Sequence, residues 1–222
     1  MKSIAVLGCG WLGERIGKSF LKDGWKVNAS SRNKNRLKCF IDLGFNPFTI
    51  DIEENNTIFS NFFDVDFLII STTNKNPSTH EKLLTIIEKS RVKKIFFISS
   101  TSVYKKSNVD LTINSTLVNS PLVEVEKVYQ TSGKTYILRC GGLIGDNRQP
   151  GNFFKKGATI KNPHGFVRLI HYNEIISGIK SLIENDNKQG IHNLIRETKE
   201  NRFEFYSKAY HEFHEVSGDF KK

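Results

Sequence analysis

Short apolar runs alternate with amphipathic segments along much of the chain. Residues Ser3 to Leu7 form a run without polar alternation, which is typical of a parallel strand buried on both faces. Beyond the glycines that follow, Leu12, Ile16 and Phe20 recur at the spacing of one helix face, and Gly24 follows where such a helix would end. The first strand is therefore predicted to feed directly into a helix.

The same alternation continues toward the C-terminus. Further strands are predicted at residues 26–30, 48–52, 67–71, 94–99 and 135–139, and helices at residues 34–44, from Pro77 and after Ser120-Pro121. Strands that alternate with helices predict an α/β fold of Rossmann type, a doubly wound parallel sheet.

The last third of the chain is less regular. Residues 140–165 are rich in glycine and basic residues with little periodicity, which predicts a loop region on the substrate side. Strands at 167–170 and 191–195, a helix at 173–184 and an aromatic helix from Arg202 are predicted to complete the chain. We expect a single domain over residues 1–222, with residues 1–139 mainly forming the Rossmann core. Residues 140–222 would mainly form a small C-terminal substrate lobe and the last sheet elements.

Composition and charge narrow the class of protein. The 222 residues carry 33 Lys and Arg against 23 Asp and Glu, a formal charge of +10. Basic and acidic residues are interleaved, so the positive field suits an anionic small molecule, and nucleic acid is not predicted as a partner. The longest apolar runs fall far short of the roughly 20 residues of a membrane span, so no membrane partner is expected. No secretory signal core develops at the N-terminus, which predicts a cytoplasmic location.

Three cysteines, Cys9, Cys39 and Cys140, are odd in number and widely spaced. None has the neighbours expected of a zinc or redox motif, so they are interpreted as reduced thiols and no metal site is predicted.

A glycine-rich turn stands between the first predicted strand and helix. It reads Gly8-Cys9-Gly10-Trp11-Leu12-Gly13. In a GxGxxG at this place the first glycine permits a tight turn, the second lets the backbone approach a pyrophosphate, and the third lets the helix pack closely on the strand. Gly8, Gly10, Trp11, Leu12 and Gly13 are therefore predicted to bind a dinucleotide cofactor.

The end of the second predicted strand bears on the choice of cofactor. NAD enzymes usually carry an acidic residue there, whereas this chain has Ser31 and Arg32. Arg32, with Lys34 nearby, could pair with a 2′-phosphate, so NADP is favoured and NAD remains the alternative. Asp51, after the third strand, could accept a hydrogen bond from adenine or cap a following helix, and Ser71, after the fourth, is assigned to the same site.

Five short segments of the chain, taken in order, carry a family pattern. They are residues 4–13, Asp51-Ile52, residues 98–104 (ISSTSVY), residues 137–145 and residues 169–175. Together they resemble the atypical, extended branch of the short-chain dehydrogenase/reductase superfamily, the NAD(P)-dependent epimerase/dehydratase-like proteins. The resemblance implies an NAD(P)-binding oxidoreductase or epimerase/dehydratase-like enzyme. Its substrate would be a small carbonyl or hydroxyl compound, with a nucleotide-sugar among the candidates.

The resemblance also implies catalytic residues. In that family a Ser or Thr after the fifth strand acts together with a Tyr-x-x-x-Lys pair, and position matching gives the hydroxyl role to Ser100. The expected Tyr and Lys fall near Val118 and Leu122, and no Tyr-x-x-x-Lys occurs anywhere in the chain. Tyr104 is then the next candidate acid, with a packing role as its alternative.

Two arginines and one histidine complete the candidates. Arg139 and Arg148, around the glycine-rich segment, are predicted to bind an anionic group of the substrate, with a structural ion pair as the alternative for Arg139. His171 is predicted to organise the backbone ahead of a helix. Because the Tyr-Lys pair is missing, a non-catalytic NADP(H)-binding sensor or regulatory protein of the same fold is the rival prediction. The oligomeric state is left open, and a homodimer is compatible with the sequence.

Overall fold

A computed structural model of the chain describes residues 1–54, 61–106, 110–185 and 189–214. Its main element is a parallel sheet of seven strands in the order β3-β2-β1-β4-β5-β6-β9. The strands are β1 (Ser3–Leu7), β2 (Lys26–Ser31), β3 (Asn46–Thr49), β4 (Phe67–Ile70), β5 (Lys94–Ser100), β6 (Thr135–Cys140) and β9 (Gly190–Leu194). The order reverses at β1, so the predicted Rossmann-type, doubly wound α/β fold is confirmed.

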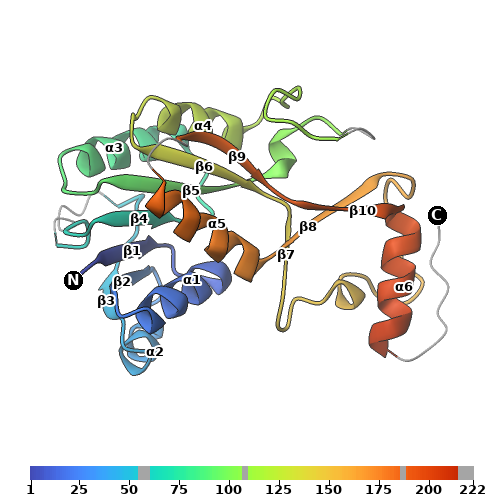
Figure 1. Cartoon of the computed structure of the whole chain (residues 1–222), viewed down its shortest axis with the longest axis horizontal. Coiled ribbons are helices and arrows are strands. Elements are labelled where there is room, and N and C mark those ends of the chain that lie inside the picture. The colour runs from blue at the N-terminus through green and yellow to red at the C-terminus, as the bar shows by residue number, and fades with distance from the viewer. Residues whose placement is uncertain (55–60, 107–109, 186–188, 215–222) are drawn as a thin grey trace.

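Helices cover both faces of this sheet (Figure 1). They are α1 (Trp11–Lys22), α2 (Arg36–Asp42), α3 (Pro77–Glu88), α4 (Pro121–Gln130) and α5 (Tyr172–Glu184). Strand β1 shows why two faces need cover, since successive side chains of a strand point to opposite sides. Ile4 and Val6 belong to the core beneath α1 and α5, whereas Ala5 and Leu7 belong to the core beneath α3 and α4. Every residue of β1 is buried as a result.

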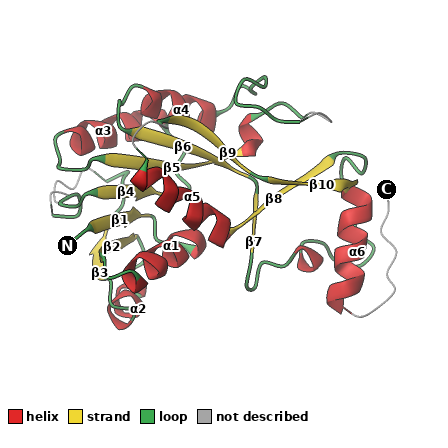
Figure 2. Ribbon diagram, in the orientation of Figure 1, coloured by secondary structure: helices red, strands yellow, loops and turns green. Residues whose placement is uncertain are grey.

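A smaller lobe begins where β6 ends. It holds a three-stranded sheet of β7 (Gly142–Ile144), β8 (Phe166–His171) and β10 (Arg196–Asn201), followed by α6 (Arg202–His214). This lobe has its own core, which contains Ile160, Val167, Leu169, Tyr206 and Tyr210. Figure 2 shows β8, β10 and α6 extending to one side of the main sheet. Because β7 follows β6 after one residue, the lobe starts at the carboxyl edge of the main sheet.

The structure corrects three details of the predicted elements. The third strand is Asn46–Thr49 and not 48–52, because its pairing runs from Asn46 opposite Asn28 to Thr49 opposite Ser31. The segment 140–165 contains β7 and a short 3₁₀ helix, Pro150–Asn152, where only a loop was expected. Strand β10 was not predicted, because its sequence RETKEN has no apolar residue to mark a period.

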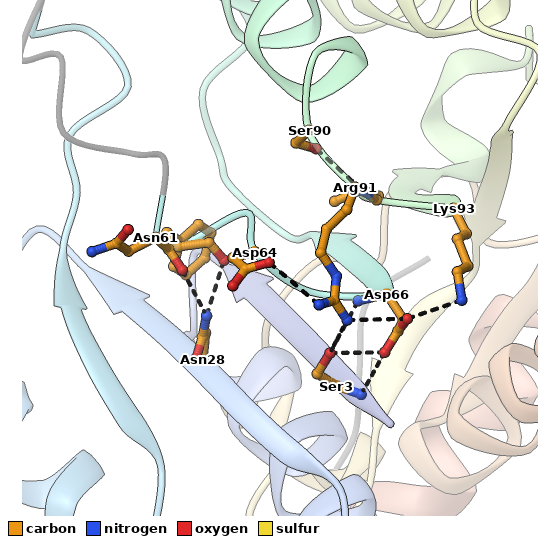
Figure 3. Close-up of polar contacts among 10 residues, drawn as sticks. Ser3, Asn28, Asn61, Asp64, Asp66, Ser90, Arg91 and Lys93 are labelled. Atoms are coloured by element: carbon orange, nitrogen blue, oxygen red, sulfur yellow. Dashed lines mark hydrogen bonds and ion pairs between the residues drawn. The ribbon is translucent and has the colours of Figure 1, made fainter. Parts of the chain in front are cut away.

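Polar side chains tie the amino ends of three strands together (Figure 3). Ser3, which opens β1, donates hydrogen bonds from its amide and hydroxyl to Asp66 Oδ2 at 3.1 and 2.9 Å. Arg91 and Lys93 pair with Asp66 Oδ1 at 3.2 and 3.0 Å. Burial of the carboxylate opposes its ionisation, but Lys93 and the Ser3 donors outweigh that effect and lower the pKa of Asp66 to about 2. This network stabilises the amino ends of the strands, at the edge of the sheet opposite to their carboxyl ends.

Candidate functional site

The three glycines of the turn meet different surroundings. Gly8 has a φ of +81°, and a Cβ there would lie 2.9 Å from the backbone oxygen of Ser71, so a tight left-handed turn needs glycine. A Cβ on Gly13 would lie 2.8 Å from Val6 Cγ1, which shows how closely α1 packs on β1. A Cβ on Gly10 would meet only the Gly8 carbonyl oxygen, at 3.9 Å, so the space in front of Gly10 is open.

That open space belongs to a cavity of about 520 Å³, which we call the glycine-turn cavity. It lies beyond the carboxyl ends of β1 to β4, where open α/β sheets bind their ligands. Of the predicted cofactor-binding residues, the cavity wall includes Gly8, Gly10, Ser31, Arg32, Asp51 and Ser71. Residues that the sequence places far apart are thus brought to one site.

The start of α1 has backbone amide groups that are available to bind a ligand. Its N-cap is Gly10, and within the described part of the chain no side chain caps this helix. Uncapped amides and the positive end of the helix dipole attract an anion such as a pyrophosphate. Leu12 can contribute only backbone here, since its side chain is 4% exposed and lies in the core. The open cradle at Gly10 and the uncapped helix end fit a dinucleotide.

Two arginines line the glycine-turn cavity near the end of β2. Arg32 is largely exposed, and its Nη1 lies 4.0 Å from Asp51 Oδ2. Arg36, which the sequence analysis missed, donates from Nη1 to the Cys9 carbonyl at 2.9 Å and from Nη2 to Glu14 Oε2 at 2.7 Å. The available signal was a basic residue near the start of the helix that follows β2, close in sequence to Arg32. Lys34, by contrast, is exposed and does not line the cavity.

Trp11 and Arg148 meet at a junction between the lobe and α1. Trp11 Nε1 donates to Asn147 Oδ1 at 2.8 Å, and the Arg148 guanidinium lies 4.4 Å from the Trp11 ring centre. Arg15, one turn further along α1, pairs with Asp146 Oδ2 at 2.7 Å. Trp11 and Arg148 therefore fasten the 145–148 turn to the first turn of α1, next to the uncapped start of that helix.

Ser100 and Tyr104 share a second cavity of about 460 Å³, which we call the Ser100 cavity. It lies beyond the end of β5, the strand next to β4. The Ser100 Oγ accepts a hydrogen bond from the Ser102 amide at 3.1 Å, which leaves the hydroxyl proton for a ligand. Val118, where the family's tyrosine would stand, also lines this cavity. The sequence-predicted catalytic residues are thus brought together, without a Tyr-Lys pair.

Arg139 is a correction, because the structure supports its structural alternative and not a substrate contact. The side chain is 1% exposed and lines neither cavity. Its Nη2 pairs with Glu126 Oε2 at 2.6 Å, and its Nη1 donates to the Tyr104 hydroxyl at 2.9 Å. That hydroxyl in turn donates to Asn193 Oδ1 at 2.6 Å. All three guanidinium nitrogens thus donate to groups inside the protein.

Two other side chains near the site are also structural. His171 caps α5, since its Nδ1 accepts from the Asn173 amide at 3.2 Å while Glu174 accepts from the His171 amide at 3.1 Å. The expectation that His171 organises the backbone is confirmed. Burial raises the pKa of the Cys9 thiol to about 12, so it stays protonated at neutral pH and is a poor nucleophile.

Comparison with known proteins defines the class of this site. The family described as NAD(P)H-binding matches residues 8–164, and the chain belongs to that family. Protein YeeZ of Escherichia coli K12 is 26% identical over 227 residues, which cover 93% of this chain and 82% of YeeZ. The expected NAD(P)-binding family is confirmed, and the likeness to epimerase/dehydratase-like proteins is a likeness of fold: a putative NAD-dependent epimerase/dehydratase from Methylobacillus flagellatus has a TM-score of 0.72 at 15% identity.

Solved structures share the whole architecture. A conserved protein of unknown function from Silicibacter pomeroyi DSS has a TM-score of 0.82 at 18% identity, covering 100% of this chain and 82% of its own. The UDP-glucuronic acid 4-epimerase of Bacillus cereus, solved with UDP-glucuronic acid and NAD, has a TM-score of 0.78 at 17% identity, covering 100% and 86%. No helix in the described ranges is both long and apolar enough to cross a membrane. The match to the NAD(P)H-binding family supports a nicotinamide cofactor and does not distinguish NAD from NADP.

Proposed function

We propose that this chain is an NADP(H)-dependent oxidoreductase or epimerase/dehydratase-like enzyme that acts on a small carbonyl or hydroxyl substrate. The observation that carries the proposal is a pair of separate cavities at the carboxyl edge of one sheet, beyond the ends of neighbouring strands. One holds the glycine turn and Arg32, and the other holds Ser100. Strands β4 and β5 are neighbours, so a dinucleotide lying along this edge reaches from the first cavity toward the second.

The preference for NADP rests on the end of β2. Its last residue is Ser31, followed by Arg32, so the end of β2 itself carries no carboxylate; the nearest one to Arg32 that the structure gives is Asp51, whose Oδ2 lies 4.0 Å from Arg32 Nη1. Arg32 and Arg36 both line the cavity there, and guanidinium groups bind phosphate with charge-assisted hydrogen bonds. Arg32 is the better ligand, because Arg36 already donates to Cys9 and Glu14.

Ser100 is the residue of this chain that is the candidate for donating a proton to the reacting oxygen of the substrate. The cofactor, when bound, supplies or accepts the hydride. The Ser100 hydroxyl accepts from the Ser102 amide, which fixes the oxygen and leaves its proton to donate to a substrate oxygen. Tyr104 is less suited to that role, because its hydroxyl already bonds both Arg139 and Asn193.

The alternative is a non-catalytic protein that senses NADP(H). Val118, on the wall of the Ser100 cavity, cannot carry a proton, and Leu122 packs with apolar neighbours. These two residues favour the alternative, and the retained Ser100 favours an enzyme. Reduction of any carbonyl substrate by bound NADPH separates the two proposals. The cytoplasmic location and a homodimer stay predictions.

The cofactor assignment is tested with Arg32→Ala and with Lys34→Ala as a control of equal charge. Lys34 lies two residues away and outside the cavity. Arg32→Ala is expected to weaken NADPH binding by about 1.5–3 kcal/mol, while NADH binding barely changes, because only NADPH carries the 2′-phosphate. Lys34→Ala should leave both unchanged. Equal losses for NADPH and NADH, or a wild type that prefers NADH, would show that the NADP assignment is wrong.

A further inference from the structure

His80 is a buried titratable side chain with no part in the proposed chemistry. It lies on α3 and is 0% exposed. Its Nδ1 lies 2.8 Å from the hydroxyl oxygen of Tyr129 on α4, and its Nε2 lies 3.1 Å from the backbone carbonyl oxygen of Asn74. The ring also packs edge-on against Phe97 of β5. His80 therefore joins the loop before α3 to the interior of the protein.

The two partners determine which ring nitrogen carries the hydrogen. Burial lowers the pKa of His80, so its imidazole is neutral at neutral pH. Because a carbonyl oxygen only accepts hydrogen bonds, Nε2 carries the hydrogen and donates it to Asn74. Nδ1 is then the acceptor of a hydrogen bond from the Tyr129 hydroxyl. Each ring nitrogen thus has one partner, and Nε2 is the one that holds Asn74.

Asn74 lies on the wall of the glycine-turn cavity, in the loop between β4 and α3. Its amide donates to Thr72 Oγ1 at 3.2 Å, and its Oδ1 accepts from the Asn76 amide at 2.8 Å. Its Nδ2 donates to Glu53 Oε1, and its carbonyl is held by His80. All four polar groups of Asn74 are therefore engaged, which gives this residue a defined position at the cavity.

The hydrogen bond between Asn74 and Glu53 joins two sides of the glycine-turn cavity. Glu53 follows β3 and Asn74 follows β4, and the sheet places β2 and β1 between those two strands. Both residues line the cavity, together with Gly10 and Arg32. The bond thus spans the ends of four strands, and its place depends on the place of Asn74.

We propose that His80 is a positioning residue of the cofactor site, which holds Asn74 and its bond to Glu53 where a bound dinucleotide requires them. The inference rests on the proposed function, since it concerns binding in the glycine-turn cavity. His80 is fully buried, so it acts through Asn74 and does not touch the ligand. A wall that already has its binding position loses little further freedom when the ligand binds, so the affinity is higher.

The proposal predicts an equal effect on NADPH and NADH. The 2′-phosphate is assigned to Arg32, after β2, whereas His80 acts on the loop after β4. Loss of the His80 contact should therefore weaken the binding of both dinucleotides by the same factor. Loss of Arg32, by contrast, is expected to weaken NADPH alone.

The test uses two substitutions that keep different parts of the imidazole. The amide nitrogen of His80→Gln can take the place of Nε2 and donate to Asn74, whereas the shorter His80→Asn reaches only the place of Nδ1. Energy transfer from tryptophan to the reduced nicotinamide measures both dissociation constants. His80→Asn should raise each Kd about tenfold, as expected if the loop keeps its binding position about one-tenth of the time. His80→Gln should stay within about threefold of wild type.

Tyr129→Phe is the matched control for stability. It leaves the buried Nδ1 without a donor, while the bond from Nε2 to Asn74 remains. This variant should unfold at a lower urea concentration than wild type, yet bind both dinucleotides within about twofold of wild type. If His80 is merely structural, affinity will instead follow stability, and Tyr129→Phe will lose as much affinity as an equally destabilised His80→Asn.

Glu53→Ala tests the other end of the bond at an exposed position, so it decides the matter even if His80→Asn does not fold. It should raise both Kd values at least about threefold. Glu54→Ala removes the same charge from the next residue, which does not line the cavity, and should change neither value by more than about twofold.

The proposal is overturned by unchanged affinities in His80→Asn or in Glu53→Ala. Equal losses of affinity in His80→Asn and Tyr129→Phe, or a loss confined to NADPH, would also contradict it. If wild-type protein binds neither dinucleotide, the proposed function fails on its own. Hydrogen exchange at the amides of Asn74 and Asn76 then decides the role of His80. Faster exchange in His80→Asn than in His80→Gln supports the positioning of the loop, and equal exchange overturns it.

Discussion

Arg139 Nη1 donates a 2.9 Å hydrogen bond to the hydroxyl oxygen of Tyr104, beneath the Ser100 cavity. The same guanidinium pairs with Glu126 on α4, and both of these side chains are 1% exposed. Tyr104 lines the Ser100 cavity, and its hydroxyl is held by an ion pair that is buried outside that cavity. The stability of the fold therefore depends on both partners, because removing one would leave the other buried without a counter-charge.

The first prediction concerns that ion pair. Glu126→Ala would leave the Arg139 guanidinium buried without its counter-charge, and should lower the free energy of unfolding by about 3–5 kcal/mol. Glu124→Ala, two residues earlier on α4, removes an exposed partner of Lys127 and should cost less than about 1 kcal/mol. Urea unfolding of the three proteins measures both values. Equal losses of unfolding free energy in the two variants would show that the buried pair stabilises the fold no more than the exposed pair does.

The second prediction separates Ser100 from Tyr104. Ser100→Ala should keep the affinity for NADPH and lose turnover by about 10²–10⁴-fold, the range for a proton-transfer group. Tyr104→Phe should retain most of the turnover but lower stability by about 1–3 kcal/mol, because the Arg139 Nη1 loses its acceptor. Single-turnover oxidation of bound NADPH with aldehydes, ketones and nucleotide-keto-sugars measures the rates. Loss of turnover in Tyr104→Phe with retention in Ser100→Ala would reverse the two roles.

The third prediction uses pH. The pKa of Asp66 is lowered from 3.8 to about 2, so the folded protein favours the carboxylate. The stability from this group is fully present above about pH 4 and is lost as the pH falls toward 2. Asp66→Asn should therefore cost up to about 2 kcal/mol at pH 7 and flatten the pH dependence of unfolding between pH 4 and 2.

Asp64→Asn is the matched control for that experiment. Asp64 also pairs with Arg91, at 3.4 Å, but its side chain is 68% exposed. Thermal unfolding followed across this pH range should leave Asp64→Asn close to wild type. A wild-type pH dependence in the Asp66→Asn protein would mean that Asp66 is not the group that titrates.

The fold was predictable where the burial of an element produces a recognisable pattern of apolar residues in the sequence. Every residue of β1 is buried because helices cover both faces of the sheet, so its apolar run stands out. Among the described residues, β10 pairs with β8 alone, at the edge of the small sheet, and its polar sequence carries no such pattern. Local turn chemistry, including the glycine turn and the cap at His171, was also readable from neighbouring residues.

The site was predictable only in part, because its remaining members depend on contacts between distant residues. Arg36 reaches the carbonyl of Cys9, 27 residues earlier in the chain. Arg139 looked like a substrate ligand from its place after a strand, and only its contact with Glu126 shows that it is structural. The Ser100 cavity arises because the lobe folds back toward β5, which no local spacing reveals.

The central claim is that a nicotinamide dinucleotide binds in front of Gly10, and the most direct test is the affinity of Gly10→Val for NADPH. Apart from its neighbours in the chain, the nearest described atom to a Cβ at Gly10 would be the Gly8 carbonyl oxygen at 3.9 Å, so the variant should fold normally while its side chain fills the cradle. Gly133→Val, at a surface turn where a Cβ meets nothing within 4 Å, is the control. Energy transfer from tryptophan to NADPH should saturate with wild type and Gly133→Val, and should be abolished in a normally folded Gly10→Val. An unchanged affinity in Gly10→Val would contradict the account.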